Sequence, residues 1–223
     1  MDMTDGFSDD WEYEYQRRDS YTEWPWSTLI SHIMRHVDVD STNSVLELGC
    51  GTGANIPFFL GLDMDYYAIE GSETAIQHVG DRFPEIRDQV ICGDFTTEFP
   101  DYGPFDLIVD RGSLTCNSTA GIKRTLRLID QHLASGCRFV SIDNFSTDHS
   151  GFTGGNKTAE ELTKRFEEGP FEGYGEIHFW TEEHIQNIYD GFIIEHLTHQ
   201  VSDQIVPYKD FRQAFFHIVV KNE

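Results

Sequence analysis

Residues 45–55 join an apolar run to an acidic side chain and three closely spaced glycines, in the order Val-Leu-Glu-Leu-Gly-Cys-Gly-Thr-Gly-Ala-Asn. Glu47 lies within the apolar run, and Gly49, Gly51 and Gly53 follow it. Glycine tolerates positive φ and lets a ligand come close to the backbone. The spacing differs from the Gly-x-Gly-x-x-Gly pattern of dinucleotide-binding turns. It predicts a ligand-binding turn between a strand and a helix, although an ordinary tight connection fits the same residues.

Three later apolar runs also end in side chains that could bind a ligand. Glu70 lies about twenty residues beyond the glycine turn, where an acidic residue is expected to accept both hydroxyls of a ribose. Asp94 could accept an adenine amino group while Phe95 covers the ring. The fourth run, 105–110, continues into Arg111-Gly112-Ser113-Leu114. Ligands of open α/β sheets bind beyond the carboxyl ends of the strands, so we expect these side chains to share one site.

In this order, the segments between residues 45 and 142 resemble the motifs of class I S-adenosylmethionine-dependent methyltransferases. The resemblance implies an α/β fold with a doubly wound, seven-stranded, mostly parallel sheet and an antiparallel final strand. It also implies S-adenosylmethionine as the cofactor and methyl transfer to an O, N or S atom of a small molecule. The cofactor contacts that it implies are Glu47, Gly49, Cys50, Gly51, Glu70, Gly71, Asp94, Phe95, Asp110 and Arg111.

The catalytic residues are less well defined, because an activated methyl group mainly requires that both reactants are held in position. The segment 110–114 is similar to one in thiopurine- and tellurite-type small-molecule methyltransferases, in which the arginine lies close to the acceptor. Asp110 and Arg111 are therefore candidates, but Arg111 could equally pair with Asp110 or with a helix end. His149 and His178 are candidate bases in or beside a glycine-rich segment.

Two alternatives remain open at this point. Asp110, Asp143 and Asn144 occupy the places of the Mg²⁺ ligands in catechol-type O-methyltransferases, and a bound Mg²⁺ would acidify an acceptor hydroxyl. The glycine turn does not resemble that subgroup, so we assign no metal ligand. The second alternative is a module that binds S-adenosylmethionine without catalysis.

Alternating strand and helix patterns predict a single domain over residues 1–223, with a sheet covered on both faces. Residues 1–37 form an N-terminal cap, of which 1–20 lack lasting periodicity and are expected to be disordered until a ligand or partner binds. Residues 146–175 form a lid or substrate loop with one helix at 159–166. Aromatic residues of the cap could form a wall over the acceptor, namely Tyr13, Tyr15, Tyr21, Trp24 and Trp26. The expected strands are 44–48, 66–70, 89–92, 105–110, 137–142, 192–199 and 214–220, and the other helices are 27–37, 54–62, 72–83, 122–134 and 181–189.

Composition limits the partners and the compartment. The formal net charge of -23 would repel a phosphate backbone, so nucleic acid is not an expected partner. No apolar run is long enough to cross a bilayer, and no signal-peptide core precedes the domain. The four cysteines lack zinc-binding spacing and are expected to be reduced, which favours the cytoplasm. The oligomeric state does not follow from the sequence.

Overall fold

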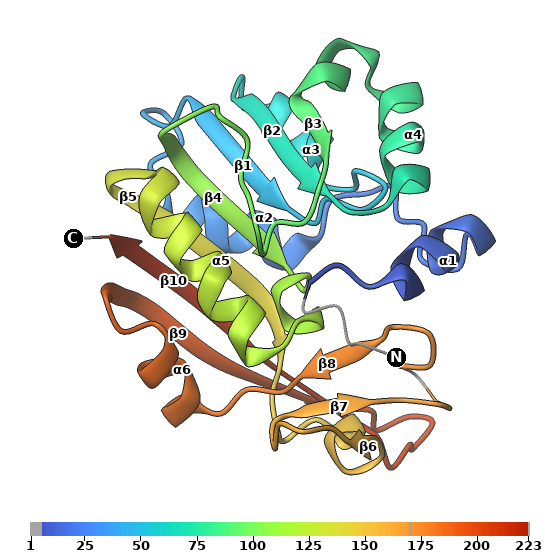
Figure 1. The fold of residues 1–223 in the computed structure, drawn as a ribbon. Helices are drawn as coiled ribbons and strands as arrows, with labels where there is room; N and C mark the ends of the chain where they lie inside the picture. Colours follow the sequence, from blue (N-terminus) through green and yellow to red (C-terminus); the bar gives the residue numbers. More distant parts are fainter. Residues whose placement is uncertain (1–5, 170, 223) are drawn as a thin grey trace.

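The computed structural model describes residues 6–169 and 171–222, and its centre is a seven-stranded sheet (Figure 1). The strand order is β3-β2-β1-β4-β5-β10-β9, and only β10 runs antiparallel to its neighbours. This confirms the predicted sheet with its antiparallel final strand. The strands are β1 (Ser44–Leu48), β2 (Asp65–Glu70), β3 (Val90–Cys92), β4 (Phe105–Arg111), β5 (Leu133–Phe145), β9 (Phe192–Asp203) and β10 (Arg212–Asn222).

Helices cover both faces of this sheet, and each face has its own apolar core. Helix α5 shows why, since Ile122, Leu126 and Ile129 recur at helical spacing and are buried against the sheet. Its first turn is capped by Ser118, whose hydroxyl accepts the N–H of Gly121 at 3.1 Å. Helices α5 (Thr119–His132) and α6 (Glu182–Ile188) cover one face, and α2 (Ser27–His36), α3 (Ile56–Leu60) and α4 (Glu73–Arg82) cover the other.

The expectation of disorder over residues 1–20 is wrong for the described part, while residues 1–5 lie outside the described residues. Helix α1 (Asp9–Arg17) begins at Ser8, whose hydroxyl accepts the N–H of Asp10. Acidic residues in its first turn stabilise the helix by interacting with the positive end of its dipole. Its buried side chains are Glu14 and Tyr15, so the packed face is polar and aromatic. This helix could not be predicted from aliphatic residues at helical spacing, because its buried face has none.

The helix expected at 159–166 is also wrong, because this region pairs into a small antiparallel sheet. Strands β6 (Asn156–Lys157), β7 (Thr163–Arg165) and β8 (Glu176–His178) form it, with short 3₁₀ turns elsewhere in the chain at 84–89, 114–116 and 150–153. Phe166, Phe171, Ile177 and Phe179 form its own apolar cluster. Pairing and burial thus override the weak helical preference of a short segment. Below, the term lid denotes residues 146–179, which include this small sheet and the expected loop at 146–175, and their role as a lid stays a prediction.

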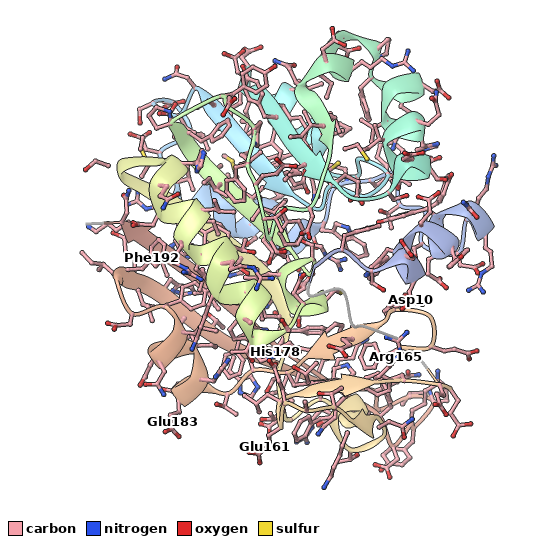
Figure 2. The ribbon with its side chains drawn as sticks, in the orientation of Figure 1. Asp10, Glu161, Arg165, His178, Glu183 and Phe192 are labelled. Carbon is pink, nitrogen blue, oxygen red and sulfur yellow. The ribbon has the colours of Figure 1, made fainter. Side chains whose placement is uncertain are left out.

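The cap and the lid contact each other directly. Asp10 of α1 and Arg165 of β7 form an ion pair with an N–O distance of 2.9 Å (Figure 2). Trp11 of α1 stacks on Tyr174 of the lid, with ring centroids 4.9 Å apart. These contacts hold α1 across one end of the sheet (Figure 1). Among the described helices, none is long and apolar enough to cross a membrane.

Candidate active site

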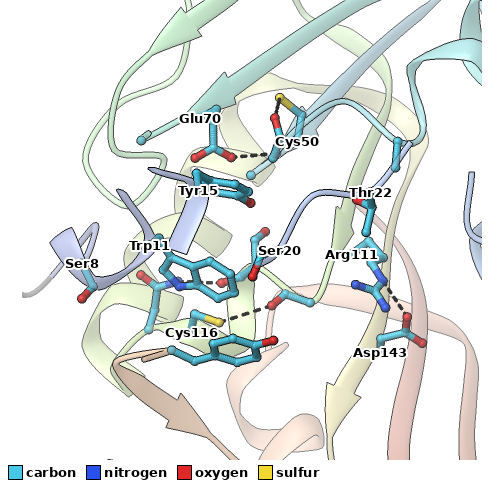
Figure 3. A pocket seen from close by; sticks show the side chains of 18 of the residues that line it. Ser8, Trp11, Tyr15, Ser20, Thr22, Cys50, Glu70, Arg111, Cys116 and Asp143 are labelled. Atoms are coloured by element: carbon cyan, nitrogen blue, oxygen red, sulfur yellow. Dashed lines mark hydrogen bonds and ion pairs between the residues drawn. The ribbon is translucent and has the colours of Figure 1, made fainter. Parts of the chain in front are cut away.

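A cavity of about 510 Å³ lies where the carboxyl ends of the parallel strands meet the cap and the lid (Figure 3). Its floor is the glycine turn after β1 together with the residues that follow β2, β3 and β4. Its walls come from α1, the lid and β10. Of the ten cofactor contacts predicted from the sequence, nine line this cavity, namely Glu47, Gly49, Cys50, Gly51, Glu70, Gly71, Asp94, Phe95 and Arg111.

The glycine turn has the backbone that its sequence predicts. Gly51 has φ 54°, a conformation that residues with a Cβ rarely adopt. A Cβ at Gly51 would lie 2.6 Å from the hydroxyl oxygen of Tyr15. Glycine is therefore required here by the backbone and by the close packing of the cap.

Glu70 is held by the backbone on one side, which leaves it able to bind a ligand on the other. Its Oε2 accepts the N–H of Gly51 at 2.8 Å, and its Oε1 accepts the N–H of Ser72 at 2.9 Å. Burial raises the pKa of this carboxyl above its ordinary value, whereas the backbone donors oppose that shift. Each oxygen keeps acceptor capacity, so the fixed carboxylate can accept the two hydroxyls of a ribose.

Asp94 faces the same cavity, and the cap lies directly against it. Its Oδ1 accepts the N–H of Thr96 at 2.8 Å, and its Oδ2 accepts the N–H of Phe7 at 3.2 Å. The Phe7 ring packs on Gly71, because a Cβ there would lie 2.0 Å from a Phe7 ring carbon. The cap therefore covers the part of the cavity between β2 and β3. Phe7 was not identified from the sequence, since nothing in residues 1–20 marks it as a ligand-facing residue.

Glu47 connects β1 to the residues around the glycine turn by buried hydrogen bonds. Its two oxygens accept hydrogen bonds from Asn55 Nδ2 at 2.8 Å and from the hydroxyl of Tyr66 at 2.6 Å. Burial raises the pKa of Glu47 to about 7, against the opposing effect of these two donors. Asn55 in turn accepts the N–H of Trp26 at 3.2 Å, which links the turn to the start of α2.

Asp110 was predicted as a cofactor contact and as a catalytic candidate, but it does not line the cavity. It is fully buried, and its Oδ1 accepts the N–H groups of Ser113 and Leu114 at 3.0 and 2.9 Å. Its Oδ2 accepts the hydroxyl of Ser141 at 2.7 Å. These contacts show that Asp110 fixes the turn after β4, which in turn positions the next residue, Arg111.

Arg111 does line the cavity, and its partner is neither Asp110 nor a helix end. Its Nε donates to Asp143 Oδ2 at 2.8 Å (Figure 3). Its guanidinium carbon lies 3.7 Å from the ring centroid of Trp26. Asp143 has φ 59°, and its backbone N–H donates to His217 Nδ1 at 3.2 Å. The unusual backbone at Asp143 therefore turns the carboxylate toward Arg111.

The three oxygen ligands of the magnesium alternative do not converge. Asp110 and Asn144 both bond to Ser141 Oγ in the interior, at 2.7 and 2.8 Å. Asp143 instead points at Arg111. Within residues 6–169 and 171–222, no group of three or more His, Cys, Asp or Glu side chains is arranged to hold a metal ion.

The two candidate histidines have different surroundings. His149 lines the cavity, and its Nδ1 accepts the N–H of Gly151 at 3.0 Å. Burial lowers the pKa of His149 to about 4, so the ring is neutral near pH 7 and carries its proton on Nε2. His178 does not line the cavity, and its Nδ1 contacts Thr163 Oγ1 at 3.1 Å inside the lid. Burial lowers the pKa of His178 to about 3, which suits a structural residue.

The predicted aromatic wall exists in part. Tyr15, Tyr21 and Trp26 line the cavity, whereas Tyr13 and Trp24 are 62% and 80% exposed. Further aromatic lining residues were not predicted from the sequence, and they come from the cap, the end of β5, the lid and the chain at the start of β10. The helical spacing of Trp11 and Tyr15 could have indicated the first of them, but the lid residues depend on tertiary pairing. The missed residues include Phe7, Trp11, Phe145, Phe171, Tyr174, Phe211 and Phe215.

Comparisons with known proteins agree with this geometry. Residues 46–139 match the family model of a methyltransferase domain. No curated protein matches the chain in sequence.

Several solved structures share the whole fold. An S-adenosylmethionine-dependent methyltransferase from Clostridium acetobutylicum is 19% identical with a TM-score of 0.64, covering 94% of this chain and 96% of its own. The N-methyltransferase NodS from Bradyrhizobium japonicum, solved with S-adenosyl-L-homocysteine, is 13% identical with a TM-score of 0.64, covering 96% and 99%. TehB from Haemophilus influenzae is 12% identical with a TM-score of 0.64, covering 95% and 67%. Residues 46–139 thus match a methyltransferase domain, and the chain as a whole shares its fold with solved S-adenosylmethionine-dependent methyltransferases.

Proposed function

We propose that this enzyme methylates an O, N or S atom of a small molecule. The observation that carries the proposal is the cavity of about 510 Å³, whose walls are formed by the cap, the lid and β10. A site covered by Phe7, Trp11 and Tyr174 suits a compact acceptor better than the surface of a macromolecule. The similarity to NodS, a known N-methyltransferase, makes nitrogen one of the acceptor atoms to test.

The residues present fit S-adenosylmethionine. Glu70 would accept the ribose hydroxyls, Asp94 would accept the adenine amino group, and the glycine turn allows close approach of the methionine part. When bound, the cofactor supplies a methyl carbon to which the acceptor lone pair bonds, while the carbon–sulfur electron pair passes to sulfur and the acceptor loses any surplus proton to water. Acidic side chains also suit the positive charge of a sulfonium.

The protein's own contribution is positioning and exclusion of water. Aromatic side chains of the cap and the lid cover the cavity, and Arg111 is fixed by Asp143 and Trp26. Neutral His149 is not placed to take a proton from the acceptor, because its unprotonated nitrogen already accepts the N–H of Gly151. It is instead suited to donate a hydrogen bond from Nε2 to an acceptor heteroatom.

Calorimetric titration with S-adenosylmethionine, followed by measurement of S-adenosylhomocysteine release with hydroxyl, thiol and amine acceptors, tests the proposal. We expect micromolar or tighter binding and turnover with at least one acceptor. Binding without any turnover would favour the non-catalytic alternative. Activity with a basic protein and with no small molecule would also overturn the proposal.

We also propose that the enzyme acts in the cytoplasm without a nucleic-acid partner. The four cysteines are free thiols, and the chain carries a formal net charge of -23. Both properties fit a reducing compartment and a surface that repels phosphate backbones. Cell fractionation and a filter-binding assay with RNA and DNA would test the two parts separately.

A further inference from the structure

The acceptor side of the cavity is lined by a continuous series of rings. Trp11 stacks on Tyr174 at an interplanar angle of 27°. From Tyr174 the series continues to Phe171, with centroids 6.3 Å apart, and from Phe171 to His149 at 5.3 Å and to Phe145 at 4.8 Å. The other end of the series is Phe215 of β10, whose ring centroid lies 5.3 Å from that of Phe145. We call these six residues the aromatic belt: Trp11, Tyr174, Phe171, His149, Phe145 and Phe215.

The belt has four separate origins in the chain, yet all of its members line one cavity. Trp11 comes from the cap, Phe145 from β5 and Phe215 from β10, and the other three members come from the lid. Edge-to-face contacts fix several of the rings, such as Phe145 against Phe171 at 78°. A wall of rings held in this way offers flat surfaces and few hydrogen-bonding groups, so it favours a flat, polarisable ligand.

The charged groups that line the cavity are mainly acidic. Burial lowers the pKa of His149 to about 4, so the histidine of the belt adds no positive charge near pH 7. Arg111 is the only Lys or Arg among the described lining residues, and Asp143 already neutralises it. A carboxylate or phosphate on the acceptor would thus enter a negative potential. The acidic lining residues are Asp19, Glu47, Glu70, Asp94 and Asp143.

We propose that the methyl acceptor is a flat aromatic molecule without a negatively charged group, such as an aromatic amine or a phenol. Stacking on the belt would hold its ring, and a protonated amine would gain further from the ring faces and the acidic lining. This inference rests on the proposed function and adds the substrate class. It predicts that the enzyme distinguishes acceptors by whether they carry an aromatic ring and by their charge. These two properties can be varied separately.

Matched acceptor sets test both features. One set is phenethylamine, its saturated analogue 2-cyclohexylethylamine, and phenylalanine, which adds a carboxylate. Parallel sets would carry a phenol and an aromatic thiol. We expect kcat/KM from S-adenosylhomocysteine release to be highest for an uncharged or cationic aromatic member and at least about tenfold lower for its saturated and carboxylated analogues.

Three other outcomes distinguish failure of the aromatic-acceptor proposal from failure of the proposed function. Equal or better turnover of saturated or carboxylated members would overturn the aromatic acceptor. Absence of turnover across all sets, by protein that binds S-adenosylmethionine in calorimetry, would overturn it as well while leaving the cofactor site intact. Absence of cofactor binding would overturn the proposed function itself.

Variants of the belt provide the second test. Phe215→Leu and Trp11→Leu keep apolar side chains but remove rings, and Tyr208→Leu is the control because Tyr208 is 77% exposed and lies outside the cavity. We expect each belt variant to raise KM for the best aromatic acceptor by about tenfold, and Phe215→Leu, which does not touch the cap, to keep the Kd for S-adenosylmethionine and the thermal midpoint close to those of the control. Unchanged KM in both belt variants would contradict the proposal.

Discussion

Replacement of Glu70 by glutamine tests the assignment of the nucleoside site. In the wild-type protein both Glu70 oxygens accept backbone N–H groups, from Gly51 and Ser72, and both can accept ribose hydroxyls. Glu70→Gln turns one oxygen into an NH₂ group, which would face a backbone N–H and could no longer accept a hydroxyl. The variant also removes the negative charge that strengthens the remaining bonds.

The expected loss follows from these contacts. A hydrogen bond to a charged group contributes about 1.5 to 3 kcal/mol, so losing one and weakening another should cost about 3 kcal/mol of cofactor binding. This corresponds to a Kd for S-adenosylmethionine that is about a hundredfold higher. The folded protein without cofactor should lose less stability, because the pKa of Glu70 is raised by burial and the neutral amide relieves that penalty.

Isothermal titration is the assay, with Glu73→Gln as the matched control. Glu73 is exposed in the first turn of α4, and its substitution changes the net charge by the same amount. Comparing adenosine with 2′,3′-dideoxyadenosine as ligands sharpens the test. The wild type should prefer adenosine strongly, whereas Glu70→Gln should lose most of that preference. If the preference persists, or if the Kd rises by less than about threefold, Glu70 does not bind the ribose.

Three further predictions concern the cap, the lid and the metal alternative. Glu12→Ala removes the carboxylate that accepts hydrogen bonds from Ser72 and Thr74 at the start of α4. We therefore expect faster proteolytic cleavage of the N-terminal segment and weaker cofactor binding. Unchanged cleavage kinetics would contradict this prediction. His178→Gln tests pH dependence: the pKa of His178 is about 3 in the folded protein against 6.5 ordinarily, so its stabilising effect is complete above about pH 6.5 and is lost as the pH falls. Relative to this variant, the wild type should therefore lose about 3 kcal/mol between pH 7 and about pH 4.5 in urea unfolding, and a pH-independent difference would refute the assignment. Activity should persist in EDTA, because Asp143 is paired with Arg111 and Asp110 with Ser141; loss that Mg²⁺ restores would revive the magnesium site.

The sheet and the cofactor side of the cavity could be predicted because their signals are local. Each parallel strand is an apolar run, and its last residues lie at the same edge as those of its neighbours. Glu70 and Asp94 therefore reach one cavity although 24 positions separate them in sequence. The glycine turn is equally local, since positive φ at Gly51 is a property of a few residues.

The acceptor side could not be predicted because its residues meet only through tertiary contacts. Trp11 and Tyr174 are far apart in the chain and stack only after α1 and the lid have formed. The orientation of the Asp110 side chain could not be predicted either, because a residue at a strand end can face the cavity or be buried. Two backbone donors in the turn after β4 and the Ser141 hydroxyl of β5 hold the Asp110 carboxylate in the interior.

The position of α1 has a consequence for the order of events in turnover. One short stretch lies against Asp94 through Phe7 and against Tyr174 through Trp11, and Asp10 joins it to Arg165. In the proposed arrangement both substrates and both products pass α1, so the rate at which α1 moves aside would set an upper limit on kcat. Loosening it should speed product departure and expose the reacting atoms to solvent at the same time.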